Sequence, residues 1–97
     1  MKKVDPTFYK RADEHIHLSN KQVSEEIGRG MVSASFLYSA ARFNAYVSAS
    51  GFKSSKEFIE QKEAIMAYFM DEYKRMLEDN LDDYILNFSK YLAPKEK

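Results

Sequence analysis

The chain has 97 residues, of which 44% are hydrophobic and 31% charged, and a chain of this length supports a single core. Fifteen basic residues balance fifteen acidic ones, so no long-range attraction to nucleic acid or to an anionic membrane is expected. The absence of cysteine excludes disulfides, zinc–thiolate sites and cysteine nucleophiles.

The start of the chain carries no targeting pattern. Lys2 and Lys3 follow Met1, and no apolar run comes after them, so we expect no signal peptide. No stretch reaches 18 consecutive apolar residues, so we expect no membrane span. These features predict a soluble cytoplasmic protein made of one helical domain over residues 1–97, with short flexible tails at about 1–4 and 94–97.

The first helix is expected over residues 6–27. Asp5 can accept hydrogen bonds from free amide groups at a helix start, and Pro6 is tolerated at the first helical position. Spacings of three and four residues place six side chains on one face: Tyr9, Ala12, Ile16, Ser19, Val23 and Ile27. Gly28 and Gly30 are expected to end the helix, because glycine tolerates the left-handed conformation of a C-cap.

The second helix is expected over residues 31–50, ending before Gly51. It is apolar or small almost all round, and its only strongly polar side chains are Arg42 and Asn44. A helix that is hydrophobic on every side is normally buried on every side. The sequence therefore predicts that this helix is the centre of the core.

The third helix is expected over residues 55–93. Ser54 and Glu57 form a capping-box pattern at its start, and Pro94 ends it because the residue before a proline leaves the helical region. An apolar stripe runs along this helix through Ile59, Met66, Met70, Tyr73, Leu77, Leu81, Tyr84, Phe88 and Tyr91. No alternating strand pattern is present, so the fold class is all-α with three helices.

The length of the third helix raises the question of what covers it. About forty helical residues span roughly 58 Å, whereas the two earlier helices reach about 30 Å each. The far half would leave six large side chains uncovered: Leu77, Leu81, Tyr84, Ile85, Phe88 and Tyr91. A symmetric homodimer that completes an antiparallel bundle is favoured. The alternative is a kink or fold-back near Asn80, where Asp79 or Asn80 could cap a new helix.

One polar cluster is a candidate ligand site. A buried guanidinium is costly unless it is paired, so Arg42 needs a partner, and Asp13 of the first helix is a candidate. Asn44, Tyr9 and Tyr38 could add hydrogen bonds. Three interpretations stay open: a structural ion pair that fixes how two helices dock, a pocket for an anion or small ligand, and a position at a subunit interface.

Other chemistry finds little support. Glu14 and His17 have the three-residue spacing of carboxylate-bridged di-metal bundles, but such a site needs a second Glu-x-x-His pair and further glutamates, so no metal is expected. No Gly-x-Ser-x-Gly elbow, phosphate-binding loop or dinucleotide fingerprint occurs, and no cofactor is expected. The second helix lacks the basic side chains that a DNA groove requires. A non-enzymatic protein is therefore favoured over an enzyme.

Three segments carry a resemblance to a known family. They are residues 8–13 (FYKRAD), residues 37–45 (LYSAARFNA) and residues 80–84 (NLDDY). Together they resemble a family of short bacterial proteins known only as a domain of unknown function. The resemblance implies a bacterial, all-helical protein and supplies no activity, ligand or catalytic residue. The sequence thus predicts a small oligomeric interaction or structural module, with a ligand-binding bundle around Arg42 as the alternative.

Overall fold

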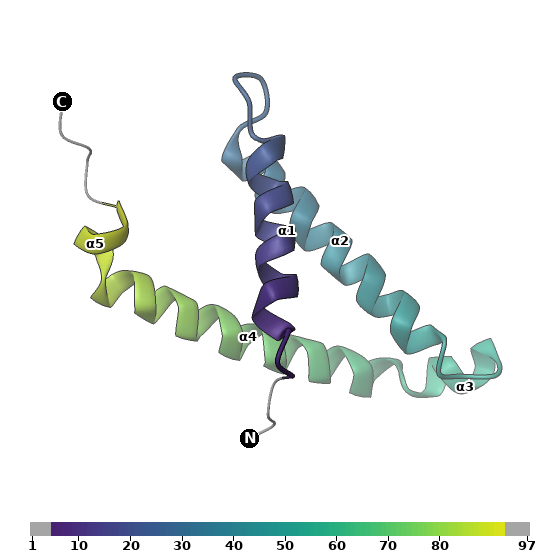
Figure 1. Ribbon diagram of the computed structural model, residues 1–97. Coiled ribbons are helices and arrows are strands. Elements are labelled where there is room, and N and C mark those ends of the chain that lie inside the picture. Colours follow the sequence, from purple (N-terminus) through teal and green to yellow (C-terminus); the bar gives the residue numbers. More distant parts are fainter. Residues whose placement is uncertain (1–4, 93–97) are drawn as a thin grey trace. The chain divides into compact units, whose positions relative to one another are not determined.

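Helices are the only regular secondary structure in residues 5–92, the part that the computed structural model describes (Figure 1). Five helices follow one another in this range instead of the three predicted. They fall into two compact units, Met1–Ala49 and Ser50–Lys97. The predicted tails at 1–4 and 94–97, and the predicted helix end at 93, lie outside the described residues.

The first unit begins with helix α1, Phe8–Gln22. The predicted helix start at Pro6 is wrong, because the helix begins two residues later and its N-cap residue is Thr7. Asp5 bonds to this N-cap residue and not to the free amides of the helix. The Asp5 carboxylate accepts a hydrogen bond from the Thr7 amide at 3.0 Å and another from the Thr7 hydroxyl at 2.9 Å. Arg11, one turn into the helix, donates to the same carboxylate at 2.8 Å.

The predicted continuation of this helix to residue 27 is wrong. Val23 has an extended backbone, with φ −74° and ψ 134°, and ends α1. Ser24 then organises the loop: its hydroxyl oxygen accepts from the Glu26 amide at 3.2 Å and from the Ile27 amide at 3.1 Å. A serine side chain that bonds to nearby amides offers the backbone an alternative to the helix, and that alternative is adopted here.

The predicted glycine cap is wrong as well. No glycine among the described residues has a positive φ. Gly28 instead precedes helix α2, Arg29–Ala49, and its carbonyl accepts from the amides of Met31 at 3.1 Å and Val32 at 3.2 Å. Gly30 lies inside the helix. The glycine pair therefore starts the second helix rather than ending the first.

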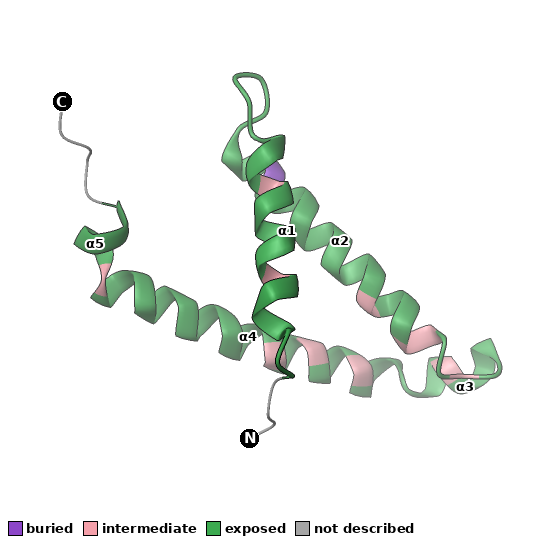
Figure 2. Cartoon of the chain, in the orientation of Figure 1, coloured by how far each residue is buried: buried purple, intermediate pink, exposed green. Residues whose placement is uncertain are grey.

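Helices α1 and α2 contact each other through a narrow face. Ala12 and Ser19, two residues of the predicted face, are half-buried on α1. The His15 ring lies 6.1 Å from the Phe36 ring of α2. Val32 is 5% exposed and is the one buried residue within residues 5–92 (Figure 2). The prediction that α2 is buried on every side is therefore not met in the single chain, where α1 covers only one side.

The second unit contains three helices in place of the single one predicted for residues 55–93: α3, Ser55–Glu60; α4, Lys62–Leu86; and α5, Phe88–Leu92. The breaks fall at Gln61, with φ −101° and ψ 1°, and at Asn87, with φ −110° and ψ 27°. Both backbones depart only locally from helical values, so each break is a single-residue interruption of the predicted long helix.

The predicted kink or fold-back at Asn80 is wrong. Residue 80 lies inside α4, and its side-chain amide donates to the Met76 carbonyl, four residues earlier, at 2.7 Å. The asparagine thus bonds back along its own helix instead of capping a new one. An uninterrupted α4 of 25 residues follows, long enough to span about 37 Å.

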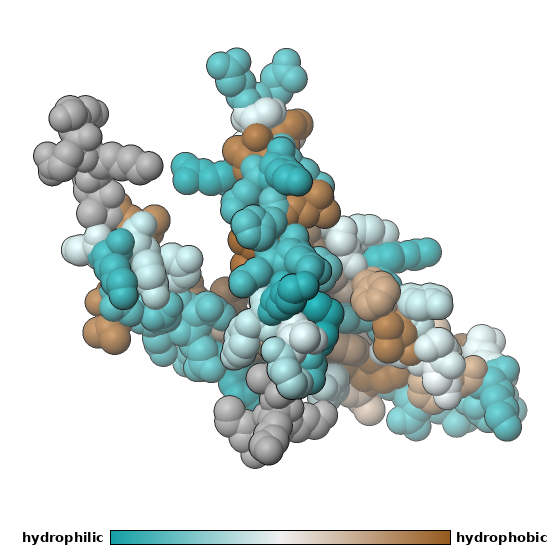
Figure 3. Space-filling model, viewed as in Figure 1, coloured by the Kyte–Doolittle hydropathy of each residue, from teal (hydrophilic) through white to brown (hydrophobic). Residues whose placement is uncertain are grey.

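Apolar side chains reach the surface along these helices (Figure 3). Despite this, no helix among residues 5–92 is long and apolar enough to cross a membrane.

Candidate functional site

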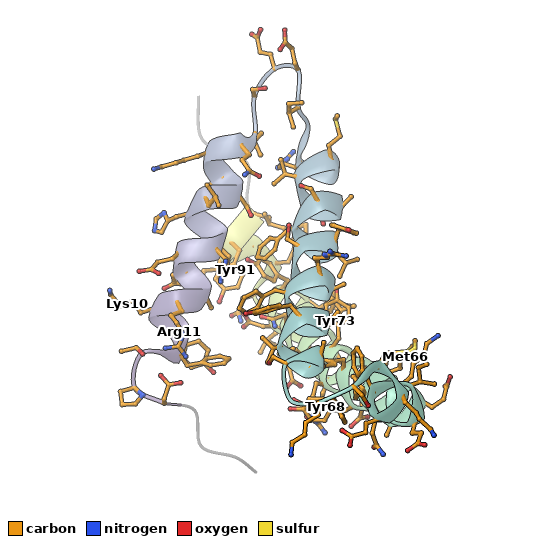
Figure 4. All side chains as sticks on the ribbon, turned by 90° about the vertical axis from the view of Figure 1, so that its right-hand side faces the viewer. Lys10, Arg11, Met66, Tyr68, Tyr73 and Tyr91 are labelled. Atoms are coloured by element: carbon orange, nitrogen blue, oxygen red, sulfur yellow. The ribbon has the colours of Figure 1, made fainter. Side chains whose placement is uncertain are left out.

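The predicted apolar stripe is carried by α4 and continues into α5. Met66 and Tyr73 project from α4 along it, and Tyr91 lies on α5 (Figure 4). The six side chains predicted for an interface are all exposed, from 42% at Leu77 to 72% at Ile85. The sequence therefore identified an apolar surface that the single chain leaves open.

A polar anchor holds the end of this surface. The Asn87 side-chain amide donates to the Asp83 carboxylate at 2.9 Å, and the Tyr91 hydroxyl donates to the other oxygen of that carboxylate at 3.2 Å. The Tyr91 ring also lies 4.9 Å from the Tyr84 ring. Asp83 thus connects the last turn of α4 to α5 across the break at Asn87. The hydrogen bond to the Asp83 carboxylate raises the pKa of Tyr91 above its usual value.

The opposite end of α4 is held by the short helix α3. Ser54 caps α3, and its hydroxyl oxygen accepts from the Glu57 amide at 3.2 Å, as the capping-box pattern predicted. Glu57 closes the box differently: its carboxylate accepts from the Lys53 amide at 3.3 Å, not from the Ser54 amide. The Phe52 and Phe58 rings stack at 5.3 Å beside this cap. Both ends of the stripe are therefore fixed by local contacts.

The charges of α4 divide into paired and unpaired groups. Arg75 forms ion pairs with Asp71 at 3.5 Å and with Glu72. Lys74 and Glu78, which are also one turn apart, form no ion pair with any residue between 5 and 92, and both are exposed. These two unpaired side chains border the apolar stripe.

The predicted ligand residues are not brought together in the single chain. Arg42 is exposed on α2, and within residues 5–92 it has no ion pair with Asp13 or any other acid. Asn44 is half-buried, while Tyr9 and Tyr38 are exposed. The expected burial of Arg42 is thus not met in the single chain, because the surface of α2 around it is open to solvent.

The candidate metal pair consists of Glu14 and His17 on α1. Glu14 forms an ion pair with Lys10 at 3.6 Å on the outer surface of α1. Figure 4 shows Lys10 directed away from the helix. Among the described residues, no group of three or more histidine, cysteine, aspartate or glutamate side chains is placed to hold a metal ion. An open hollow in the first unit is lined by Ser24, Glu25 and Glu26 and includes none of the predicted site residues.

Sequence reasoning missed two polar networks. The first joins Arg11 to Thr7 and Asp5: its guanidinium donates to the Thr7 hydroxyl oxygen at 2.7 Å and bonds both oxygens of the Asp5 carboxylate, at 2.8 and 3.3 Å. The Arg11 and Thr7 hydrogen bonds hold the pKa of Asp5 well below its usual range. The four-residue spacing of Thr7 and Arg11 could have indicated this network. The second, Asp83 with Asn87 and Tyr91, has four- and eight-residue spacings that also indicate one helical face.

Comparison with known proteins identifies a family and a similar solved structure. The sequence profile of the family described as "Protein of unknown function (DUF3144)" matches residues 8–85. The chain is also similar to a solved structure, titled "NMR structure of the protein NB7890A from Shewanella sp", with 40% sequence identity and a TM-score of 0.75. That similarity covers 98% of this chain and 100% of the other. No curated protein matches the chain.

Proposed function

Because the chain belongs to the family of proteins of unknown function DUF3144, which supplies no activity, we propose its role from its surface. The proposed role is that of a small non-enzymatic interaction or structural module that works as a homodimer. The apolar stripe of α4 and α5 is the surface that a second copy covers. One observation carries this proposal: the residues predicted for an interface are all at least 42% exposed.

The amount of open surface supports a second copy. Eight side chains of the stripe are between 42% and 65% exposed: Met66, Met70, Tyr73, Leu77, Leu81, Tyr84, Phe88 and Tyr91. At roughly 100 Å² each they offer about 800 Å², which is the area per partner of a standard protein–protein interface.

Light scattering of substituted chains tests the proposal. We expect the wild type to have twice the mass of one chain at micromolar concentration. Leu81→Asp, or Phe88→Asp, places a carboxylate in the covered stripe and is expected to reduce the mass to that of one chain, because an unpaired charge is costly to bury. Leu86→Asp is the matched control, since Leu86 is 83% exposed and lies about 140° round the helix from Leu81.

The control is expected to keep the mass of the wild type. A wild-type mass of one chain at micromolar concentration would refute the homodimer. Equal effects of Leu81→Asp and Leu86→Asp would show that the loss of mass does not depend on the stripe.

A ligand-binding bundle is the second candidate function, and one observation favours it. Arg42 is the only charged side chain between Gly30 and Ala49, and no acid within residues 5–92 pairs with it. A free guanidinium on an apolar helix suits an anion. The test is the melting temperature in inorganic phosphate: binding stabilises the wild type, whereas Arg42→Met keeps the fold and loses the stabilisation.

A further inference from the structure

Two opposite charges border the stripe on the same side of α4. Lys74 directly follows Tyr73, and Glu78 directly follows Leu77, so each charge lies about 100° round the helix from a stripe residue, in the same sense. The opposite border is formed by the residues that precede the stripe residues: Glu72, Met76, Asn80 and Asp83. Its two carboxylates are already engaged within their own chain, Glu72 by Arg75 and Asp83 by Asn87 and Tyr91. This arrangement gives one edge of the stripe a positive and a negative charge one turn apart.

These two charges are available to another chain. Their neighbour Arg75, on the far side of the helix, already binds Asp71 and Glu72 within its own turn. Lys74 and Glu78 have the i,i+4 spacing of an ion pair yet form none within residues 5–92. Lys74 and Glu78 lie at the edge of the apolar stripe. A helix that packs on the stripe therefore brings the charges at its own edge close to these two side chains.

The symmetry of a dimer decides which charges meet. In an antiparallel helix pair, the two-fold axis is perpendicular to the plane of the two helices, so the same border of each copy faces the other. Lys74 of one copy then lies opposite Glu78 of the other when the axis passes near Met76, and the same pair forms a second time. In a parallel pair each border faces the opposite border, where Asn80 carries no charge and the carboxylates of Glu72 and Asp83 are already bonded within their own chain.

We propose that two copies pair antiparallel along α4, with Lys74 of each copy bonded to Glu78 of the partner subunit across a two-fold axis near Met76. The proposal rests on the proposed homodimer and adds its orientation and register. In this register Leu77 lies opposite the space between two stripe residues of the facing helix, as packing of ridges into grooves requires. The apolar stripe supplies the contact area, and the two ion pairs select the direction of pairing.

Charge exchange tests the register. Lys74→Glu and Glu78→Lys each replace two attractive pairs with two repulsive ones, so each is expected to raise the dimer Kd about tenfold or more in low salt. The double variant, Lys74→Glu with Glu78→Lys, restores opposite charges and is expected to return to the wild-type Kd. Sedimentation equilibrium at 20 °C in low and high salt measures these constants, and circular dichroism checks that each variant is helical.

Mixing the two single variants gives a sharper result. Each Glu at position 74 then meets a Lys at position 78 of the other chain, so native mass spectrometry is expected to show mostly heterodimers. Arg75→Glu is the matched control: it makes the same charge change on the far side of α4 and is expected to leave the wild-type Kd unchanged.

The outcomes separate the two proposals. A wild type that is a monomer refutes the homodimer itself. A dimeric wild type whose Kd is unchanged by both single substitutions, or whose single variants fail to form heterodimers, refutes this register and leaves the homodimer standing.

Discussion

The two units of the chain differ in how their main helices use polar residues. In the first unit, α2 carries one charged side chain, Arg42, between Gly30 and Ala49, and its surface is apolar or small in all directions. In the second unit, α4 separates its charges from a single apolar stripe. An apolar stripe needs one covering surface, whereas a helix that is apolar all round needs several. Consequently α4 presents one continuous apolar face, whereas α2 has no preferred exposed face.

The largest expected effect concerns Val32, the one buried residue that the structure describes in the first unit. Val32→Asp places a carboxylate at a position that is 5% exposed, between α2 and α1. Burial of an unpaired charge is expected to lower the free energy of unfolding by about 2–5 kcal/mol. Thermal unfolding followed by circular dichroism would show a melting temperature lower by roughly 10 °C or more.

Leu37→Asp sharpens this result, because Leu37 is on the same helix and exposed. If α2 is exposed to solvent, Leu37→Asp is expected to lower the free energy of unfolding far less than Val32→Asp does. Equal losses would mean that a further surface covers α2 in solution, and the comparison between the two units would then fail.

The next effect concerns the start of the second unit. Ser54→Ala removes the side-chain oxygen that accepts from the Glu57 amide at 3.2 Å. Loss of a serine N-cap is expected to cost about 1 kcal/mol, measured as a shift of the urea midpoint at constant slope. Ser54→Asp is the control and should keep most of the stability. An unchanged midpoint for Ser54→Ala would indicate that the stacked Phe52 and Phe58 rings hold α3 without the cap.

A gain of stability is expected at the start of α2. Gly30 is helical and has a negative φ, and no atom beyond its chain neighbours and its own helix backbone lies within 4 Å of the position that a Cβ would take. Gly30→Ala therefore meets no clash and is expected to stabilise the fold by about 0.5–1 kcal/mol, because alanine loses less entropy on folding. A loss in the same urea titration would show that this space is occupied in solution by a closely approaching chain.

Much of the fold was predictable because helices follow from periodicity and from local boundaries. The all-α class, the Ser54 cap and the exposed stripe each depend on residues close together in the sequence. The errors came from competition between local signals. Ser24 redirected the chain before Ile27, although the apolar spacing continued through it. Asn80 bonded back to Met76, although its sequence pattern also suited a cap.

The same distinction between local signals and contacts between helices applies to the candidate site residues. Leu77, Leu81 and Tyr84 share a face by helical periodicity alone, so their exposure on one surface was predictable. The predicted pairing of Arg42 with Asp13 would join two helices, and spacing along the chain carries no information about how two helices dock. A contact between two helices follows from how the helices pack in the chain or in its assembly.

The anchor between α4 and α5 offers a test at alkaline pH. Tyr91→Phe removes the hydrogen bond to Asp83 and keeps the ring beside Tyr84. Since the folded pKa of Tyr91 is raised, its contribution to stability is full below the unfolded pKa of about 10 and is lost as the pH rises through the folded pKa. The difference in melting temperature between wild type and variant should shrink between pH 8 and pH 11. A difference independent of pH would mean that the hydroxyl does not act through Asp83.

The smallest expected effect lies at the start of α1, and its pH dependence has the opposite sign. Asp5→Asn weakens the interaction with Arg11 and Thr7. Because the folded pKa of Asp5 is lowered, its contribution is full above the unfolded pKa of about 4 and is lost as the pH falls toward the folded pKa. The wild type should therefore have a higher melting temperature than Asp5→Asn at pH 7, and the difference should be smaller at pH 2. Arg11→Met should behave like Asp5→Asn.

Asp13→Asn is the control, since Asp13 is exposed and pairs with no base in residues 5–92. A pH-dependent loss as large for Asp13→Asn would assign the effect to the net charge of α1 rather than to the Asp5–Arg11 pair.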